Sequence, residues 1–400
     1  MKDILIIAHF TQVPGEAGNG RFHYIAEKID KKYSTVEVVT TTFSHRTKKQ
    51  RYLSKEQYES LSYKLTMLEE PGYKKNVSLK RFYSHFIMGK SLKRYLKYRN
   101  KPDIIYCSVP SLDVAKVAAT FAKENDIKFI LDIQDLWPEA FKMVFNIPYI
   151  SDKLFYPMEK KANHIYKAAD EIIAVSQTYV DRALEVNSKC RNAYSVFLGT
   201  ELTNFDILAM KNKNIEKPKN EIWLAYAGTL GHSYDLTSAI DALCILQKKG
   251  INNIKFVIMG DGPLKSSFEK YAAEKQINVL FTGRLDYGKM VGILVNCDIA
   301  INPISKGAAQ SIINKHGDYA AAGLPVINTQ ESLEYRDLVN EYQMGINCKN
   351  NDAENLALNL QRLYVDIDQR RTMGINSRRL AEEKFNRSIT YKKIIDLITN

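Results

Sequence analysis

The sequence predicts an α/β protein made of two doubly wound halves, each built on a parallel sheet. Four hundred residues exceed what one ordinary hydrophobic core needs, and two domains of about 200 residues each are the usual outcome. Short apolar runs alternate with segments of helical periodicity through both halves. Between them, Ala209–Glu221 is polar, lacks periodicity and contains Pro218, as is typical of a linker. We therefore expect two Rossmann-like domains facing across a cleft, with the linker at 209–220.

The composition is that of an ordinary soluble globular chain, with 45% hydrophobic and 26% charged residues. The N-terminus carries a short apolar run next to Asp3, which predicts a first strand and not a signal peptide. No stretch approaches the roughly 18 apolar residues of a membrane-spanning helix. We expect a cytoplasmic protein. The cysteines are scattered without a Cys-x-x-Cys pair, which indicates small buried residues in a reducing compartment: Cys107, Cys190, Cys244, Cys297 and Cys348.

The net charge of +12 is concentrated in one segment. Residues 46–101 contain 16 Lys or Arg, four Glu and no Asp, so this segment accounts for the whole excess. It is rich in aromatic residues, and its later part, 79–98, places apolar side chains at helical spacing. Three interpretations are open: a solvated surface, nucleic-acid binding and attachment to an anionic membrane. Because no nucleic-acid module signature is present, we favour the membrane and exclude nucleic acid as a partner. The side chains expected to contact the membrane are Lys90, Lys93, Arg94 and Lys97.

The first half begins with a strand at Ile4–Ala8, followed by a loop that contains Gly15, Gly18 and Gly20. Glycine lets the backbone come close to a ligand at the carboxyl end of a strand. The Gly18-x-Gly20 string does not complete a dinucleotide-binding fingerprint, because His23 occupies the third glycine position. The expected elements that follow are a helix at 21–32, a strand at 36–39, the basic insert at 44–101, a strand at 103–109, a helix at 112–123, a strand at 129–132 and further strand–helix units at 153–186.

The second half repeats the pattern of a strand followed by a glycine turn. A strand at Trp223–Ala227 ends in Gly228-Thr229-Leu230-Gly231, and a strand at Phe256–Met259 ends in Gly260-Asp261-Gly262-Pro263. A third strand, from residue 280, runs into Arg284, and helical periodicity covers 352–383. Open α/β sheets bind ligands at the carboxyl ends of their strands, which is where these turns lie.

The stretch from Cys297 to Ile327 organises the second half. Two apolar runs that read as buried strands flank a short helix, which opens at Asn314-Lys315 and stops at Gly323. A helix that starts at the carboxyl end of a parallel strand directs backbone N–H groups at a bound phosphate, and Lys315 adds a full charge. Asp318, one turn further, is suited to accept hydrogen bonds from ribose hydroxyls. The pattern predicts a nucleotide site with Asn314 as the N-cap.

Two motifs carry a resemblance to a known family. The pattern Asn-Lys-x-x-Asp-Tyr-x-Ala-Ala-Gly-x-Pro-Val, at 314–326, resembles the nucleotide-sugar motif of family 4 retaining glycosyltransferases, which have the GT-B fold. The string Asp-x-x-Asp-Leu-Trp-Pro, at 132–138, resembles the branch of that family that builds bacterial surface polysaccharides. The resemblance implies an acceptor-side domain at 1–208, completed by a C-terminal helix at 387–400, and a nucleotide-sugar-binding domain at 221–386.

The resemblance also implies roles for individual residues. Asp318 would hold the ribose, and Gln310 stands where the family often has a second acidic residue near the sugar. Gln134 stands where many members have a His, followed by the acid Asp135, and this pair takes the catalytic position. Arg21 matches a basic residue on the acceptor side. The other residues implied to face the donor are Gly18, Gly20, Gly228, Thr229, Arg284, Lys289, Asn314 and Lys315.

The leaving diphosphate needs positive charge around it. Many family members supply an Arg and a Lys where this chain has Thr229 and Tyr234, so we expect Lys315, Lys289, Arg284, Lys306 and backbone N–H groups to take over this task. The sequence has no Asp-x-Asp and no His/Asp cluster of ligand spacing, so we expect activity without a metal or another cofactor.

The predicted function is transfer of a sugar from a UDP-linked donor to a lipid-linked saccharide, with retention of the anomeric configuration. N-acetylated sugars are among the candidates for the transferred group. The expected place is the inner face of the cell membrane, in capsule or O-antigen type assembly. A sugar-nucleotide epimerase of the same fold is one alternative, although it would not need the basic segment. A non-catalytic assembly protein is the other, and it is suggested by Gln134, Thr229, Tyr234 and Gln310.

Overall fold

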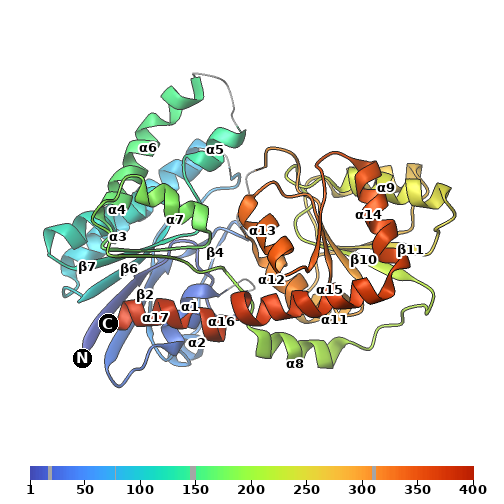
Figure 1. Ribbon diagram of the computed structural model, residues 1–400. Coiled ribbons are helices and arrows are strands. Elements are labelled where there is room, and N and C mark those ends of the chain that lie inside the picture. Colours follow the sequence, from blue (N-terminus) through green and yellow to red (C-terminus); the bar gives the residue numbers. More distant parts are fainter. Residues whose placement is uncertain (17–19, 77, 145–149, 309–311) are drawn as a thin grey trace. The chain divides into compact units, whose positions relative to one another are not determined.

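The computed structural model describes residues 1–16, 20–76, 78–144, 150–308 and 312–400. The chain divides into two compact units (Figure 1). Unit 1 comprises Met1–Phe197 together with Tyr391–Asn400, and unit 2 comprises Leu198–Thr390. Both units are parallel-sheet α/β structures, which confirms the predicted fold class.

Unit 1 is built on a seven-stranded parallel sheet of order β5-β2-β1-β6-β7-β8-β9. Its strands are β1 (Lys2–Ile7), β2 (Ser34–Thr41), β5 (Lys64–Leu68), β6 (Ile104–Val109), β7 (Lys128–Ile133), β8 (Glu171–Ala174) and β9 (Asn192–Ser195), with a small antiparallel pair β3 (Phe43–Ser44) and β4 (Lys49–Gln50). Its helices are α1 (Arg21–Lys28), α2 (Lys55–Glu59), α3 (Leu79–Tyr98), α4 (Leu112–Glu124), α5 (Glu139–Val144), α6 (Ile150–Ala168), α7 (Gln177–Leu184) and α17 (Lys392–Thr399).

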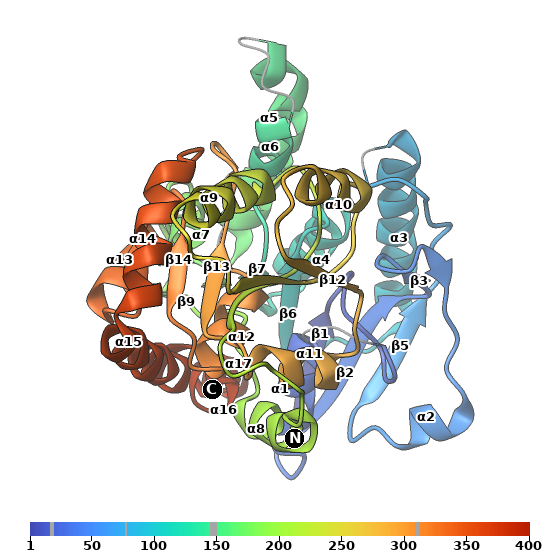
Figure 2. The same cartoon turned by 90° about the vertical axis from the view of Figure 1, so that its right-hand side faces the viewer.

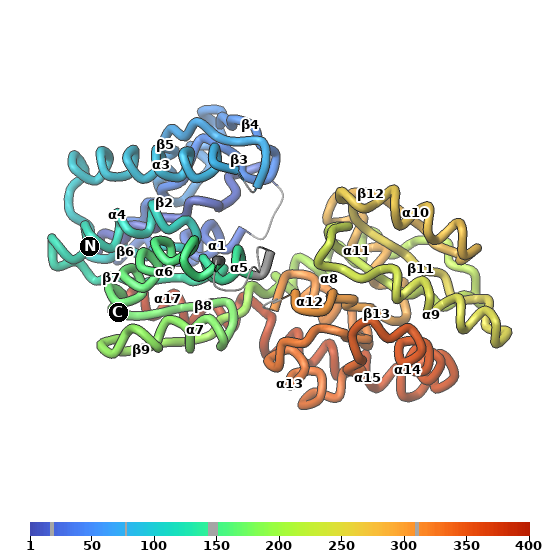
Figure 3. The backbone as a smooth tube through the Cα atoms, turned by 90° about the horizontal axis from the view of Figure 1, so that it is seen from above, coloured from blue at the N-terminus to red at the C-terminus, as the bar shows by residue number. Residues whose placement is uncertain are grey.

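The apolar run of β1 explains why helices cover both faces of this sheet. Successive side chains of a strand point to opposite faces. Leu5 and Ile7 pack in one cluster with residues of α3, α4 and α6, whereas Ile4 and Ile6 pack in another with residues of α1 and α17. Burial on both faces favours a continuous apolar run, which β1 has from Ile4 to Ile7. The last helix, α17, lies among the elements of unit 1 (Figure 3).

The basic segment is part of the sheet architecture and not an insert beside it. Strand β5 pairs with β2 and forms the edge of the sheet (Figure 2), and α3 packs against α4. Much of its charge is paired: Arg51 with Glu16, and Arg99 with Asp3 and Glu37. The sequence analysis did not predict β5, because its apolar pattern is short and lies among polar residues.

Unit 2 is built on a six-stranded parallel sheet of order β12-β11-β10-β13-β14-β15. Its strands are β10 (Ile222–Ala227), β11 (Ile254–Met259), β12 (Val279–Gly283), β13 (Ile299–Asn302), β14 (Val326–Asn328) and β15 (Gly345–Asn347). Its helices are α8 (Leu202–Asn212), α9 (Leu236–Lys248), α10 (Lys265–Glu274), α11 (Tyr287–Leu294), α12 (Asn314–Ala321), α13 (Leu333–Glu341), α14 (Ala353–Val365), α15 (Ile367–Leu380) and α16 (Arg387–Thr390), with a π-helical turn η1 (Ala381–Phe385).

The division between the units falls before the predicted linker. Residues 202–212 form α8, which belongs to unit 2 and packs against α11. Gly292 on α11 allows this approach, because a Cβ there would lie 2.4 Å from the carbonyl oxygen of Asn212. The polar end of α8 carries little periodicity, so the sequence placed the boundary about ten residues too late.

Within the described residues, the structure contains no helix with the length and apolar character needed to cross a bilayer.

Candidate functional site

Helix α12 connects β13 to β14 and begins at the carboxyl end of β13, as predicted. The residue that precedes it is Ile313, whose N–H donates to Nδ1 of His316 at 3.1 Å. Asn314 is therefore the first helical residue, with an exposed side chain, and not the N-cap that the sequence suggested. The helix stops where Gly323 adopts a φ of +66°.

Two contacts fix α12 in unit 2. The hydroxyl of Tyr319 accepts the N–H of Ala227, at the end of β10, at 2.8 Å. Gly317 faces Thr200, and a Cβ at this position would lie only 2.7 Å from the Thr200 hydroxyl. The helix therefore needs a glycine at this turn in order to come close to Thr200.

Asp318 lies half-buried beside that contact. Its Oδ1 accepts hydrogen bonds from the hydroxyls of Tyr287, at 2.8 Å, and Thr200, at 3.2 Å. Burial raises the pKa of Asp318, while the two hydrogen bonds and the charge of Arg387 oppose the shift. Sequence reasoning identified Asp318 but missed Tyr287 and Thr200, since they come from distant elements.

Lys315 is buried, with 6% of its surface exposed, and within the described residues its Nζ has no hydrogen-bond partner. The ammonium group lies 4.0 Å from the ring centre of Tyr234 and 4.7 Å from that of Tyr226. Burial lowers the pKa of Lys315 well below its ordinary value. A buried cation without a counterion is costly, so this side chain is suited to an anionic ligand.

The glycine turn after β10 adjoins the same tyrosine. The Tyr226 hydroxyl donates to the Thr229 carbonyl at 2.7 Å, and Gly228 and Thr229 are exposed. The turn packs tightly on the next one, because a Cβ at Gly260 would lie 1.8 Å from the Gly228 carbonyl oxygen. Gly228, Thr229 and Lys315 therefore share Tyr226 as a common neighbour.

The remaining donor-side predictions lie elsewhere or outside the described residues. Arg284 is exposed, and Lys289 is exposed and pairs with Asp286 at 3.5 Å. Lys306 is also exposed. Gly18 and Gln310 lie outside the described residues, and Gly20 precedes α1 with a φ of +66°.

Arg21 is buried in unit 1, and its predicted place on the acceptor side stays a prediction. It is 2% exposed and binds Asp132 through Nε, at 2.8 Å, and Nη2, at 3.3 Å. Tyr106 also donates to Asp132, and the Arg21 guanidinium lies over the ring of Tyr391. The buried carboxylate of Asp132 requires a counterion, and Arg21 provides it.

Asp135 is engaged by its own loop. Its Oδ1 accepts the N–H of Leu136 at 3.0 Å, and its Oδ2 accepts Nε1–H of Trp137 at 3.2 Å. Burial raises the pKa of Asp135, and these hydrogen bonds oppose the shift. The neighbouring Gln134 is half-buried and its amide lies 3.5 Å from Asp132. The geometry gives Asp135 a role in ordering this loop, and its catalytic role stays a prediction.

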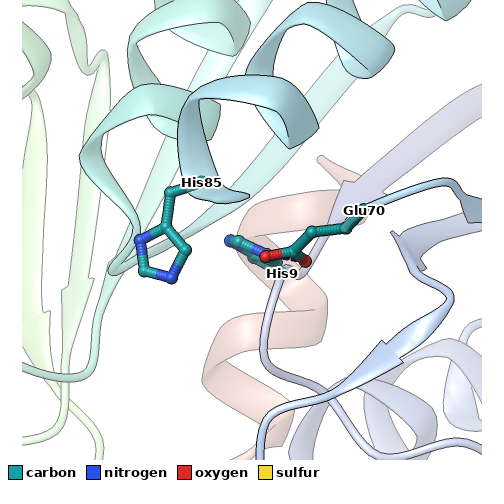
Figure 4. Close-up of side chains that lie close together, drawn as sticks. All are labelled: His9, Glu70 and His85. Atoms are coloured by element: carbon teal, nitrogen blue, oxygen red, sulfur yellow. Dashed lines mark hydrogen bonds and ion pairs between the residues drawn. The ribbon is translucent and has the colours of Figure 1, made fainter. Parts of the chain in front are cut away.

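The structure brings together a group that the sequence did not reveal. His9 follows β1, Glu70 follows β5 and His85 lies on α3, and all three are buried (Figure 4). His9 Nε2 lies 2.7 Å from Glu70 Oε2, and His9 Nδ1 lies 2.8 Å from the hydroxyl of Ser111. No local sequence signal marks this group, since its members lie at least 15 positions apart.

One ligand atom of each member of this group lies within 4.8 Å of the others, a spacing that invites comparison with a metal site. Both nitrogens of His9 are already hydrogen-bonded, and the second oxygen of Glu70 accepts the hydroxyl of Ser84 at 2.5 Å. A metal at about 2.0–2.2 Å from each ligand would have to break these bonds. The arrangement is that of a hydrogen-bonded network that joins β1, β5, β6 and α3.

The predicted membrane-contacting side chains on α3 are exposed, and they are grouped. Lys90, Lys93, Arg94 and Lys97 lie on the C-terminal half of the helix. The N-terminal half exposes Leu79, Tyr83 and Phe86. Basic and aromatic side chains also meet on this face, since Lys90 lies over the ring of Phe86 and Lys97 over that of Tyr98.

Comparisons with known proteins find a family that part of the chain resembles. Residues 210–380 match the family model described as "Glycosyl transferases group 1". This range lies within unit 2 and contains α12. Residues 210–380 are therefore similar to the glycosyltransferases of group 1, in the direction that the sequence predicted.

Two curated relatives and one solved structure extend the comparison. An uncharacterized glycosyltransferase, MJ1069 of Methanocaldococcus jannaschii, is 26% identical over 254 residues, which span 62% of this chain and 64% of that protein. CapM of Staphylococcus aureus, a capsular polysaccharide biosynthesis glycosyltransferase, is 23% identical over 75% of this chain and 77% of its own length. The Anabaena protein Alr3699/HepE, solved in complex with UDP, has a TM-score of 0.70 at 13% identity and covers 100% of both chains. This likeness supports the GT-B fold class.

Proposed function

We propose that the protein transfers a hexosyl or N-acetylhexosaminyl group from a UDP-linked donor to a lipid-linked saccharide, with retention of configuration. The observation that carries this proposal is the pair of groups on α12, one turn apart: an unpartnered buried ammonium at Lys315 and a carboxylate at Asp318. Phosphate and ribose present the complementary chemistry.

Binding of the donor would provide ligand partners for both Lys315 and Asp318. A diphosphate gives Lys315 the anion that it lacks, and the N-terminus of α12 adds partial positive charge. Asp318 uses Oδ1 for Tyr287 and Thr200, so Oδ2 would accept the ribose hydroxyls. The hydroxyls of Tyr287 and Thr200 hold the carboxylate in place for this contact.

The chemistry follows from where charge develops. When the bond from the sugar to the diphosphate breaks, negative charge grows on the β-phosphate, where Lys315 and backbone N–H groups would stabilise it without a divalent metal. The departing phosphate oxygen would take the proton of the acceptor hydroxyl on the same face of the sugar. Such a reaction needs no strong protein base, in agreement with Asp135 being occupied by its own loop.

The relatives support the choice of donor and pathway. HepE was solved with UDP, which favours a uridine nucleotide. CapM is named for capsular polysaccharide biosynthesis, which favours surface polysaccharide assembly. The exposed basic and apolar face of α3 would hold the protein on the inner face of the membrane, next to a lipid-linked acceptor.

Thermal unfolding with UDP, GDP, UDP-sugars and GDP-sugars tests the donor directly. A ligand present at 100 times its Kd adds about 2.7 kcal/mol to the free energy of unfolding. We expect UDP and a UDP-sugar to raise Tm, and the guanosine nucleotides to leave it unchanged. Incubation with each nucleotide sugar alone, followed by NMR, should show no epimer. An epimer would instead establish an epimerase, and no stabilisation by any nucleotide would favour a non-catalytic assembly protein.

A further inference from the structure

Lys48 and Arg81 form a pair of cations in unit 1 that lacks a counterion. Arg81 is 8% exposed, its Nη1 donates to the carbonyl of Asn76 at 2.8 Å, and its buried Nε has no hydrogen-bond partner in the described part of the chain. The Nζ of Lys48 binds the side-chain oxygen of the same Asn76 at 2.5 Å and lies 3.4 Å from Nδ1 of His45. Throughout the described part of the chain, neither cation forms an ion pair with a carboxylate, so the charge of the pair is left uncompensated.

Both cations have a lowered pKa. Burial lowers the pKa of Lys48 to about 8, and the charge of Arg81 adds to this effect. The pKa of Arg81 is lowered by burial, and Tyr73, Asp135 and Glu70 oppose that shift. Glu70 is already bound by His9 and Ser84, and Asp135 is bound by its own loop. A bound anion would remove the penalty from both cations at once.

Aromatic rings surround the guanidinium of Arg81. The guanidinium of Arg81 lies 4.6 Å from the ring of Trp137, 5.7 Å from Tyr73 and 5.8 Å from Phe10. One turn along α3, His85 contacts the same three rings, and its buried Nε2 also lacks a partner within the described residues. Two unpartnered polar atoms from successive turns of α3 therefore meet the same aromatic wall.

We propose that Lys48 and Arg81 form a binding subsite for the diphosphate of a lipid-linked acceptor. The inference rests on the proposed function and narrows its acceptor to a saccharide joined to its lipid through a diphosphate. Arg81 lies on the same end of α3 as Leu79 and Tyr83, which are 87% and 59% exposed. The lipid would lie along these apolar side chains, while the diphosphate reaches the cations and the sugar lies against the rings.

A divalent cation at the nearby His9–Glu70–His85 group is the competing interpretation. Arg81 and Lys48 both lower the pKa of His85, after burial and His9, which places positive charge close to that group. A metal ion would add two more positive charges next to one carboxylate that is already hydrogen-bonded. The charge balance favours an anion.

Tryptophan fluorescence gives a local readout, because Trp137 is one of only two tryptophans in the chain. In a Trp223→Phe protein, Trp137 is the only tryptophan, and its ring lies against the guanidinium of Arg81. Lys315→Met in the same background removes the donor-side cation. We would titrate this protein with inorganic phosphate, inorganic pyrophosphate and geranyl diphosphate in magnesium-free buffer. We expect a saturable change in emission, with geranyl diphosphate bound at least tenfold more tightly than phosphate.

The variants that test the subsite are Lys48→Met and Arg81→Met, with Arg81→Lys as the conservative change in case loss of the buried guanidinium impairs folding. Loss of a charged hydrogen bond costs about 1.5–3 kcal/mol, so each Met variant should raise the Kd of geranyl diphosphate by about tenfold or more. Lys80→Met is the matched control, since Lys80 is the exposed neighbour of Arg81 on the same helix. It should change the Kd less than about twofold.

Three results would overturn the inference. The first is no change in the emission of the Trp223→Phe, Lys315→Met protein, and the second is an unchanged Kd for geranyl diphosphate when Lys48→Met is added. The third is equal affinity for phosphate and geranyl diphosphate, which would indicate a free-phosphate site. Calorimetry with UDP on the chain with intact Lys315 separates this inference from the proposed function. If UDP binds and the Kd of geranyl diphosphate is unchanged in Lys48→Met, only the subsite is wrong. If UDP fails to bind while the diphosphate response depends on Lys48, the donor assignment is wrong and the anion subsite stands.

Discussion

Lys315 and Asp318 lie one turn apart on α12, yet their present environments differ. Asp318 already accepts two hydrogen bonds, whereas Lys315 faces two tyrosine rings and, among the residues that the structure describes, has no hydrogen-bond partner. The sequence motif located both residues, because spacing on a helix is a local property. It did not reveal that Lys315 is buried, since the burial comes from Tyr226 and Tyr234 on another part of unit 2.

Removing the Asp318 carboxylate should weaken the donor and not the fold. Asp318→Ala is expected to reduce UDP binding by about 1.5–3 kcal/mol, the scale of a charged hydrogen bond. Tyr287→Phe, which removes one of the hydroxyls that hold the carboxylate, should cost less. Calorimetric titration of UDP measures both. Equal UDP affinity in Asp318→Ala and the parent would refute the ribose assignment.

The buried charge of Lys315 should lower the free energy of unfolding while it strengthens the binding of UDP. Because its pKa in the folded protein lies well below the ordinary 10.5, the unfolded chain binds more protons, and the stability of the parent rises with pH across that interval. Lys315→Met should therefore raise the free energy of unfolding at pH 7 by about 1–3 kcal/mol. The gain should shrink as the pH approaches 10.5. The same variant should bind UDP more weakly. Urea unfolding at pH 7 and pH 9.5 measures the gain, and a loss of stability at pH 7 would contradict it.

Helix α3 combines a buried apolar face with an exposed face of basic and aromatic residues. Met88, Leu92 and Leu96 pack in the core, while most of the exposed basic residues lie on the C-terminal half of the helix. Helical periodicity in the sequence predicted this helix, but it could not show that Arg81 and His85 turn inward, since both are polar.

The basic half of α3 should bind anionic membranes. Near an anionic leaflet each Lys or Arg contributes about 1 kcal/mol, screened within about 10 Å at 0.1 M salt. We expect the parent to co-sediment with anionic vesicles at low salt but not with neutral ones, and to be released at high salt. A variant with Gln at Lys90, Lys93, Arg94 and Lys97 should lose most of this binding and keep its UDP affinity.

The matched control carries the same loss of charge on exposed lysines of unit 2, with Gln at Lys219, Lys248, Lys249 and Lys270. It should bind vesicles almost as well as the parent. If both variants lose binding equally, the effect comes from net charge alone and α3 is not the contact surface.

At the scale of the whole molecule, the two parallel sheets were predictable because apolar runs and helical periodicity alternate through both halves. The contacts that bring distant residues together were not. Arg21 pairs with Asp132 across 111 positions, and His9 meets Glu70 across 61. Such pairs follow from the order of strands in the sheet, which a single sequence does not specify residue by residue.

Activity should not depend on a divalent metal. Lys315 and the N-terminus of α12 are expected to balance the diphosphate, and the Glu70 carboxylate of the His9–Glu70–His85 group in unit 1 is occupied by hydrogen bonds. Sugar transfer should therefore continue in excess EDTA at a rate close to that of the untreated protein. Loss of turnover on chelation, restored by magnesium or manganese, would contradict the charge balance proposed here.

NMR observation of the anomeric proton during turnover tests the central claim most directly. The protein would be incubated in EDTA with α-linked UDP-sugars, including an N-acetylated one, and a prenyl diphosphate saccharide as acceptor. We predict release of UDP together with a new glycosidic anomeric proton that keeps the small coupling of an α-linkage. The appearance of a β-linked product, or of an epimerised donor without transfer, would contradict retaining sugar transfer by this protein.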